Sequence, residues 1–417
     1  MSMESLSDKL KSLGLVPAKR VQPSLRIVPA LDDVIPGTEI HNSLGSCYLC
    51  RSEFPNGYKH GMIEFSSKIS TSEISSVSKP ATNGEMNPEG LFFLDTETTG
   101  LSGGTGIFAF LVGVGYQKAD GFRVDQYLIR DPGEEASMLL ELSNFFEKSS
   151  IISTFNGKSF DVPLLNARYT LNRLPLPFEK MNHLDLLHLS RRLWRNRLAS
   201  RTLQDLEREI LRIPRDENEV PGWMIPEIYF DYQRTGDPTP LAGVLYHNRM
   251  DILSLAALMI YISNALRQVS LDQYLLHSTD LYSMGVIYDN AGMELEAEKL
   301  FLRCLEDNDF EASFIPDIYA RLAQNYKKNE RWDDAVKMWQ AGVERRDLNA
   351  AIELAKFYEH RAGDFSTALS WARKAEDLLD QSGLWQYKKK KLSGEITARQ
   401  QRLHRLINKQ EEQSQNE

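Results

Sequence analysis

The sequence predicts an α/β domain, a mixed sheet with flanking helices, followed by an all-α region. In the middle of the chain, short apolar runs typical of buried strands alternate with helical patterns. From residue 275 onward the apolar spacing is purely helical, and one pattern of small residues and tyrosines recurs there. The length of 417 residues also exceeds what one hydrophobic core usually organises, so two domains are expected.

The expected elements of the α/β domain come in the order strand, strand, strand, helix, strand, helix. Apolar or alternating residues predict the strands, and apolar positions at helical spacing predict the helices. This order is expected of a mixed sheet with helices packed on it. From residue 183 helices dominate, and a long apolar helix closes the domain. The expected strands are 91–94, 107–116, 122–129 and 151–155, and the expected helices are 134–147, 159–171 and 241–263.

Composition shifts divide the chain into five segments. Residues 1–35 are polar, so a flexible terminus is expected and a short docking helix is the alternative. Turn signals and a Ser-rich stretch predict a hairpin and linker at 36–88. The α/β domain is expected at 89–265 and the helical repeats at 275–382. A basic, polar tail at 383–417 is expected to be a solvated helix that frays.

A recurring pattern marks the helical region. A small residue stands three positions before a Tyr, and an Ala follows the Tyr nine or ten positions later. The steps from Tyr to Tyr are 38 and 32 residues, which bracket the length of about 34 that is typical of tetratricopeptide units, so the region is tetratricopeptide-like. An unrelated helical bundle is the alternative. The three segments are Gly285/Tyr288/Ala297, Ala323/Tyr326/Ala335 and Ala355/Tyr358/Ala368.

Composition and charge limit the classes of function. The chain is 42% hydrophobic and 26% charged, as is ordinary for a soluble protein. No apolar run approaches the roughly 20 residues that span a bilayer, and no signal peptide is evident, so no membrane interaction is expected. The three cysteines do not suggest a disulfide framework, and the cytoplasm is the expected location. A net charge of −9 argues against bulk attraction to nucleic acid but allows a local basic patch.

Two acids stand at the end of the first buried strand of the α/β domain. Asp95 and Glu97 point to the same side of that strand, because side chains alternate with a period of two. Burying both unpaired would cost several kcal/mol for each charge, and a cation held between them removes that cost. The alternative is an exposed strand end at which the acids only cap the following turn.

Two more segments carry carboxylates. Asp161 stands where a strand passes into a helix, and an acid favoured by the helix dipole is the alternative interpretation there. In the long closing helix, His247 and Asp251 are four residues apart and share one face. On an apolar helix such a pair faces something polar, although a His–Asp pair on the helix surface is the simpler alternative.

Together these segments resemble the DEDD exonucleases, in which Asp-x-Glu, a later Asp and a final Asp on a closing helix occur in this order. The resemblance is greatest to the YprB-type ribonuclease-H-like family and covers about 170 residues. It implies a ribonuclease-H-like domain followed by tetratricopeptide-like repeats. Further matching stretches are Ser102–Gly106, Phe108–Gly113, His183–His188, Arg191–Trp194 and Pro221–Pro226.

The resemblance implies a metal-dependent nuclease that hydrolyses phosphodiester bonds of DNA or RNA with 3′→5′ polarity. Asp95 would bridge two metal ions, Glu97 and Asp251 would complete the first site, and Asp161 would support the second. Carboxylate oxygens favour Mg²⁺ or Mn²⁺ over zinc. The alternative is a non-catalytic nucleic-acid-binding adaptor that recruits a protein partner through its helical repeats. The intact acids favour the enzyme.

The residue that assists the attacking water departs from the family pattern. DEDD enzymes carry a His five residues before the last Asp or a Tyr four residues before it. Here His247 stands four before Asp251 and Tyr246 five before. A helix turns by about 100° per residue, so the two side chains face different directions. We assign the role to His247, which lies one turn from Asp251.

Two groups of residues are candidates for binding the substrate. The resemblance implies that the first group would contact the terminal nucleotide of the substrate. The second lies in an arginine-rich segment around Trp194, which is either a phosphate-tracking patch with an aromatic platform or a solvated basic face with a buried Trp. The candidates are Thr96, Thr98 and Asn156 in the first group and Arg192 and Arg195 in the second.

Two other groups contain residue types that bind metals, and a simpler interpretation is favoured for each. A Cys-x-x-Cys pair in the hairpin lacks a second cysteine pair, so a chance occurrence is preferred to a zinc site. Asp185 is expected to cap a helix. The groups are Cys47, Cys50, His41 and His60, and Asp185 with His183 and His188.

Overall fold

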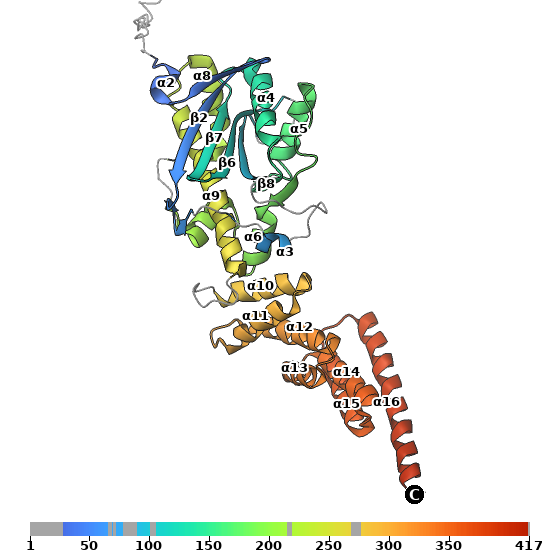
Figure 1. Cartoon of the computed structure of the whole chain (residues 1–417). Coiled ribbons are helices and arrows are strands. Elements are labelled where there is room, and N and C mark those ends of the chain that lie inside the picture. Colours follow the sequence, from blue (N-terminus) through green and yellow to red (C-terminus); the bar gives the residue numbers. More distant parts are fainter. Residues whose placement is uncertain are drawn as a thin grey trace, which may run out of the picture.

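The computed structural model describes residues 28–65, 69, 72–77, 90–100, 106–214, 219–267 and 277–415. An α/β domain is followed by helices that extend from one end of it as an elongated arm (Figure 1). The expectations for the first 27 residues, for most of the Ser-rich linker and for the Gly-rich stretch Ser102–Thr105 lie outside the described residues.

A seven-stranded mixed sheet forms the centre of the domain, in the order β1-β2-β7-β6-β5-β8-β9. Neighbours from β1 to β5 in that order are antiparallel, whereas β5, β8 and β9 run parallel to one another. The carboxyl ends of the three parallel strands therefore meet at one edge of the sheet. The bounds are β1 Thr38–Asn42, β2 Gly45–Pro55, β5 Leu91–Thr98, β6 Ala109–Lys118, β7 Gly121–Leu128, β8 Ile151–Thr154 and β9 Asn182–Asp185.

Helices cover both faces of this sheet. Leu91 and Phe93 of β5 pack in one core with α9, whereas Phe92 points the other way and packs against Phe146 of α4, with ring centroids 5.0 Å apart. The expected order of strands and helices is confirmed from β5 to α5. The helices are α4 Glu135–Phe146, α5 Asp161–Leu171, α6 Leu186–Trp194, α7 Leu203–Leu206, α8 Ile225–Thr235 and α9 Leu241–Arg267, with a short helix α2 Leu31–Val34 before β1.

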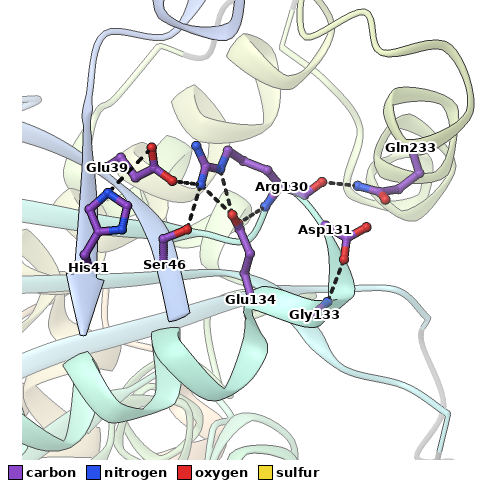
Figure 2. Close-up of polar contacts among 8 residues, drawn as sticks. All are labelled: Glu39, His41, Ser46, Arg130, Asp131, Gly133, Glu134 and Gln233. Atoms are coloured by element: carbon purple, nitrogen blue, oxygen red, sulfur yellow. Dashed lines mark hydrogen bonds and ion pairs between the residues drawn. The ribbon is translucent and has the colours of Figure 1, made fainter. Parts of the chain in front are cut away.

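The predicted hairpin, which the sequence analysis placed before the domain, pairs with the domain's sheet. β2 pairs with β7 over eight residues, and Arg130 at the end of β7 ties the hairpin down (Figure 2). The Arg130 guanidinium contacts Glu39 of β1, Ser46 of β2 and Glu134 at the start of α4. Alternating residues identify a strand but not its partner, which is why the sequence left the hairpin outside the domain.

Two short elements escaped the sequence patterns. Helix α3 (Ser72–Val77) lies within the expected linker, and its Ile74 and Val77 are buried in the core that contains α9. Strand β9 is only four residues long and mostly polar, so it carries no recognisable strand period. A second sheet is formed by β3 (Lys59–His60) and β4 (Ile63–Glu64), with two residues in each strand.

Helix α9 is the central helix of the domain. Its 27 residues include a stretch with a mean hydropathy of 1.3, so by length and composition it qualifies as a membrane span. Within the fold, however, 72% of that stretch is buried, and the helix contacts β5, β6 and β7. This burial is that of a core helix.

The arm consists of helices that pack in consecutive pairs, α10 with α11, α12 with α13, and α14 with α15. Each pair contains one of the three recurrent segments, with the small residue on the first helix and the Ala on the second. At Gly285 an added Cβ would lie 2.6 Å from the Phe301 ring, so the close approach of α10 and α11 requires glycine there. The bounds are α10 Ser278–Asn290, α11 Glu294–Glu306, α12 Ile315–Lys328, α13 Trp332–Glu344, α14 Leu348–Phe357 and α15 Phe365–Asp380.

The expected frayed tail is a continuous helix, α16 (Gln386–Gln415), that packs along α15. Ile396 and Leu403 are buried, and Arg399 and Arg402 both bind the buried Glu359 carboxylate. The apolar positions are too sparse to predict this contact, because the remaining side chains of α16 are mostly exposed.

The arm is joined to the α/β domain by buried polar contacts. The Arg197 guanidinium donates two hydrogen bonds of 2.8 Å to Asp280 of α10, and the Asp280 side chain is only 5% exposed. The Tyr288 hydroxyl donates to the carbonyl of Leu266 near the end of α9, at 2.6 Å. The arm therefore begins directly on the last turns of the domain's central helix.

We predict that Gly285→Val lowers the thermal midpoint of unfolding, because the larger side chain must displace Phe301 at the first helix pair of the arm. The expected cost is about 1–3 kcal/mol, as for other overpacked cores. Gly394→Ala in α16 is the matched control, since nothing lies within 4 Å of an added Cβ there. Equal midpoints for Gly285→Val and the parent protein would contradict this packing.

Candidate metal centre

Asp95 is held in place by the central helix. Asn248 of α9 donates a hydrogen bond of 2.8 Å to Asp95 Oδ2, and its own side-chain oxygen accepts a bond of 2.8 Å from Gln126. Gly113, opposite Asp95 in the sheet, leaves room for this amide, because an added Cβ would lie 2.3 Å from Asn248 Oδ1. A chain of buried polar groups thus fixes Asp95 on the face of β5 that α9 covers.

Asp161 approaches the same place from the start of α5. Thr96 Oγ1 donates to Asp161 Oδ1 at 2.5 Å, which links α5 to β5. The turn before α5 is braced by Asp185, whose carboxylate accepts hydrogen bonds from the backbone N–H groups of Asn156 and Lys158, at 2.8 and 3.1 Å. Asn156 adopts a left-handed φ of 70°, which asparagine tolerates better than most residues.

His247 and Asp251 both face this region from α9. His247 Nε2 lies 3.6 Å from Asp251 Oδ2, and the His247 side chain is only 8% exposed. Tyr246, in contrast, is 36% exposed, and its ring contacts the guanidinium of Arg249. The structure therefore places His247, and not Tyr246, beside the last acid.

Glu219 lies close to His247 and Asp251, and the sequence patterns did not predict it as a site residue. Its Oε1 lies 2.9 Å from His247 Nδ1, and its side chain is 8% exposed. Carboxylate and imidazole atoms of Glu219, His247 and Asp251 lie within 4.8 Å of one another, a spacing compatible with a metal ion. Glu219 follows a polar acidic run, Asp216-Glu217-Asn218, and nothing in the sequence distinguishes it from those neighbours.

The substrate-binding candidates separate into two places. Thr96 donates to Asp161, the backbone N–H of Asn156 donates to Asp185, and Thr98 Oγ1 donates to the carbonyl of Gly100. Arg192 and Arg195 instead line a cavity of about 90 Å³ against α10 of the arm. No contact with the acids is found for either arginine among the residues that the structure describes.

Trp194 is 2% exposed and packs in the core, so the proposed aromatic platform is wrong. An amphipathic helix with one basic face explains the arginine-rich segment, and Arg197 is used to dock the arm. The arginine count alone does not separate a nucleic-acid surface from a structural ion pair.

The two other metal interpretations are not supported by the geometry. Cys47 and Cys50 are buried in a strand, and burial raises the pKa of each thiol, to about 11 and about 12. His60 instead contacts Ser254 at 2.8 Å. Asp185 caps α6 by accepting from Leu187 N at 3.1 Å, as expected.

Comparison with known proteins places the chain in a family. Residues 92–263 match the RNase_H superfamily. The chain is also 34% identical over 343 residues to the uncharacterized protein YprB of Bacillus subtilis (strain 168), a match that covers 79% of this chain and 80% of YprB. The chain belongs to the YprB family.

The chain also has a partial match to a solved structure. The family B DNA polymerase from the hyperthermophilic archaeon Pyrobaculum calidifontis matches with a TM-score of 0.34 and 13% sequence identity. The match covers 62% of this YprB-family chain and 33% of the polymerase chain.

The acids of this YprB-family member strongly perturb one another. Burial raises the pKa values of Asp95 and Glu97 well above their usual range, and repulsion from Asp251 and Asp161 raises them further. Burial likewise raises the pKa of Asp161 to about 6. None of these three carboxylates forms an ion pair with a lysine or arginine of the described ranges.

These residues fit a divalent cation. Several carboxylates gathered out of water are stable as anions only beside a positive charge, and their oxygens are the ligands that Mg²⁺ and Mn²⁺ prefer. The donor set offers no thiolate, since the three cysteines are buried elsewhere. The RNase_H-superfamily domain and the acidic and histidine cluster thus agree with divalent-metal binding.

We predict that Asp161→Asn stabilises the metal-free protein near neutral pH. The folded state raises the pKa of Asp161 from 3.8 to about 6. Its ionisation therefore destabilises the fold increasingly as pH rises through that window. Asparagine retains an acceptor for Thr96 but carries no charge.

Thermal unfolding in EDTA should give a higher midpoint for Asp161→Asn than for the parent at about pH 7.5, with the difference vanishing below about pH 4. Added Mg²⁺ or Mn²⁺ should raise the parent's midpoint more than the variant's. A variant that is less stable than the parent at every pH would refute this account.

Proposed function

We propose that this protein is a metal-dependent nuclease that hydrolyses phosphodiester bonds of DNA or RNA by a two-metal-ion mechanism, with 3′→5′ polarity. One observation supports the proposal: four acids from three separate segments are close enough for their charges to repel one another. The four acids are Asp95, Glu97, Asp161 and Asp251. The RNase_H-superfamily match covers the same segments.

Each acid has a proposed role. Asp95 would bridge two ions, Glu97 and Asp251 would complete the first site, and Asp161 would support the second. When bound, the ions stabilise negative charge on the phosphoryl oxygens and lower the pKa of water. Since no covalent nucleophile is required, the protein's own groups serve to hold and orient substrate and water.

His247 would accept the proton of the attacking water. Its position one helical turn from Asp251 keeps the imidazole beside the acids, as general-base catalysis requires. Thr96 and Thr98 would contact the terminal nucleotide from the end of β5, and Asn156 would contact it from the turn that follows β8. Arg192 and Arg195 are not part of this proposal, because they lie against the arm.

The arm is proposed to be tetratricopeptide-like and to recruit a protein partner. Its consecutive helix pairs, with small residues at the close approaches, support this interpretation. Stacked helix pairs offer extended surfaces for binding other proteins. Binding at the arm would select where the nuclease acts.

We predict that purified protein shortens end-labelled DNA or RNA in Mg²⁺ or Mn²⁺ and that EDTA abolishes this shortening. Asp95→Asn should reduce the rate by at least about 10²-fold, because it weakens ion binding directly. A 5′ label should yield a ladder of shortened products, and a 3′ label should release mononucleotide first. Single-stranded and duplex substrates of both kinds decide between DNA and RNA.

Binding without cleavage in any metal would reject the nuclease and support a nucleic-acid-binding adaptor. Asp205→Asn is a suitable control, because this partly exposed acid pairs with Arg208 and contacts none of the four acids among the described residues. That variant should retain the parental rate.

We predict that His247→Ala lowers kcat by about 10²–10⁴-fold, as for loss of a general base. Tyr246→Phe should leave kcat nearly unchanged, because the Tyr246 side chain is partly exposed and contacts Arg249. Single-turnover cleavage measures both variants. The assignment fails if Tyr246→Phe abolishes cleavage while His247→Ala does not.

A further inference from the structure

Glu219 is placed to control the histidine of the site. It stands before α8, outside the helix that carries His247, so its approach to the ring is a tertiary contact. The separation of 2.9 Å between Glu219 Oε1 and His247 Nδ1 is within hydrogen-bond distance. Both side chains are 8% exposed, so water does not readily replace either partner.

The buried ring nitrogen needs an acceptor. His247 Nδ1 makes no well-aligned hydrogen bond to any described residue, because the Glu219 carboxylate lies off the N–H direction. A buried N–H left without an acceptor costs about 1–3 kcal/mol. A small rotation of the Glu219 side chain aligns the carboxylate and removes that cost.

The identity of the protonated nitrogen decides what the ring can do. A neutral imidazole carries its proton on one nitrogen and a lone pair on the other. The Glu219 carboxylate lies within hydrogen-bond distance of Nδ1, whereas the Asp251 carboxylate lies beyond that distance from Nε2, so the proton is favoured on Nδ1 and the lone pair is left on Nε2. Nε2 is the nitrogen that faces Asp251, at 3.6 Å.

We propose that Glu219 is a positioning residue that holds His247 in the Nδ1–H form, with the Nε2 lone pair directed toward the acids. Its catalytic consequence rests on the proposed nuclease function, whereas the tautomer itself is independent of activity. The competing account is a metal ion bound by Glu219, His247 and Asp251 together. In that case Glu219 would act through its charge.

The first experiment measures the tautomer by ¹⁵N NMR of full-length protein labelled at its eight histidines. His247→Gln assigns the signal. We expect the Nδ1–H form in the parent and in Glu219→Gln, which keeps an acceptor oxygen, and a shift toward Nε2–H in Glu219→Ala. Glu227→Ala, an exposed acid on α8, is the matched control and should match the parent.

An Nε2–H form in the parent, or an unchanged signal in Glu219→Ala, would overturn the proposal. So would a direct shift of a His247 ring nitrogen on adding Mg²⁺ that disappears in Glu219→Gln, because that pattern identifies a shared metal ion.

The second experiment is a double-mutant cycle on cleavage. Glu219→Ala should lower kcat by about 10–100-fold with little change in KM, and Glu219→Gln should restore most of the rate. In a His247→Ala background, Glu219→Ala should have no further effect, because Glu219 acts through the missing ring. Independent, multiplicative losses would overturn the proposal. If the parent does not cleave, the nuclease proposal fails while the tautomer measurement still decides the role of Glu219.

Discussion

Burying several negative charges at one point is the constraint on which the rest of the structure depends. Asp95, Glu97 and Asp161 repel one another in a partly buried region, and this repulsion opposes folding. Apolar packing on both faces of β5 offsets the cost, through α4 on one face and α9 on the other. The domain therefore supports the acids with one of its best-packed strands.

Hydrogen bonds from polar side chains then fix the positions of these acids. Gln126 of β7 donates a hydrogen bond to Asn248 of α9, and Asn248 donates one to Asp95 of β5. The hydrogen bond from Thr96 to Asp161 links β5 to α5. Asp185 steadies the turn between β8 and α5 from a third strand. Asp95 and Asp161 are thereby each positioned by an element other than their own, which limits how far these two acids can move when a cation binds.

Sequence periodicity was sufficient to predict how several of the site residues are placed relative to one another. A period of two placed Asp95 and Glu97 on one side, and a step of four placed His247 beside Asp251. Local sequence patterns do not predict, however, which distant residues a side chain contacts in the fold. Glu219 follows other acids in the sequence, and only the fold shows that Glu219 reaches the histidine.

The same limit explains the errors. The hairpin's alternating pattern did not reveal that β2 pairs with β7, and the four residues of β9 are too few and too polar to have revealed that strand. The arginine-rich segment after α6 predicted a surface charge, yet Arg197 is committed to a buried pair with Asp280. Whether a charge serves a ligand or a neighbouring helix depends on what lies opposite, and that is fixed only by the fold.

The contact between α9 and the arm has a consequence for how this protein can be divided. Residues of α9 and of the arm's first three helix pairs belong to one continuous hydrophobic core. A cut after Arg267 would leave apolar side chains such as Ala265 and Leu266 without their neighbours, so the fragment would be prone to self-association. The shared core therefore means that the two parts should be produced and studied as a single unit.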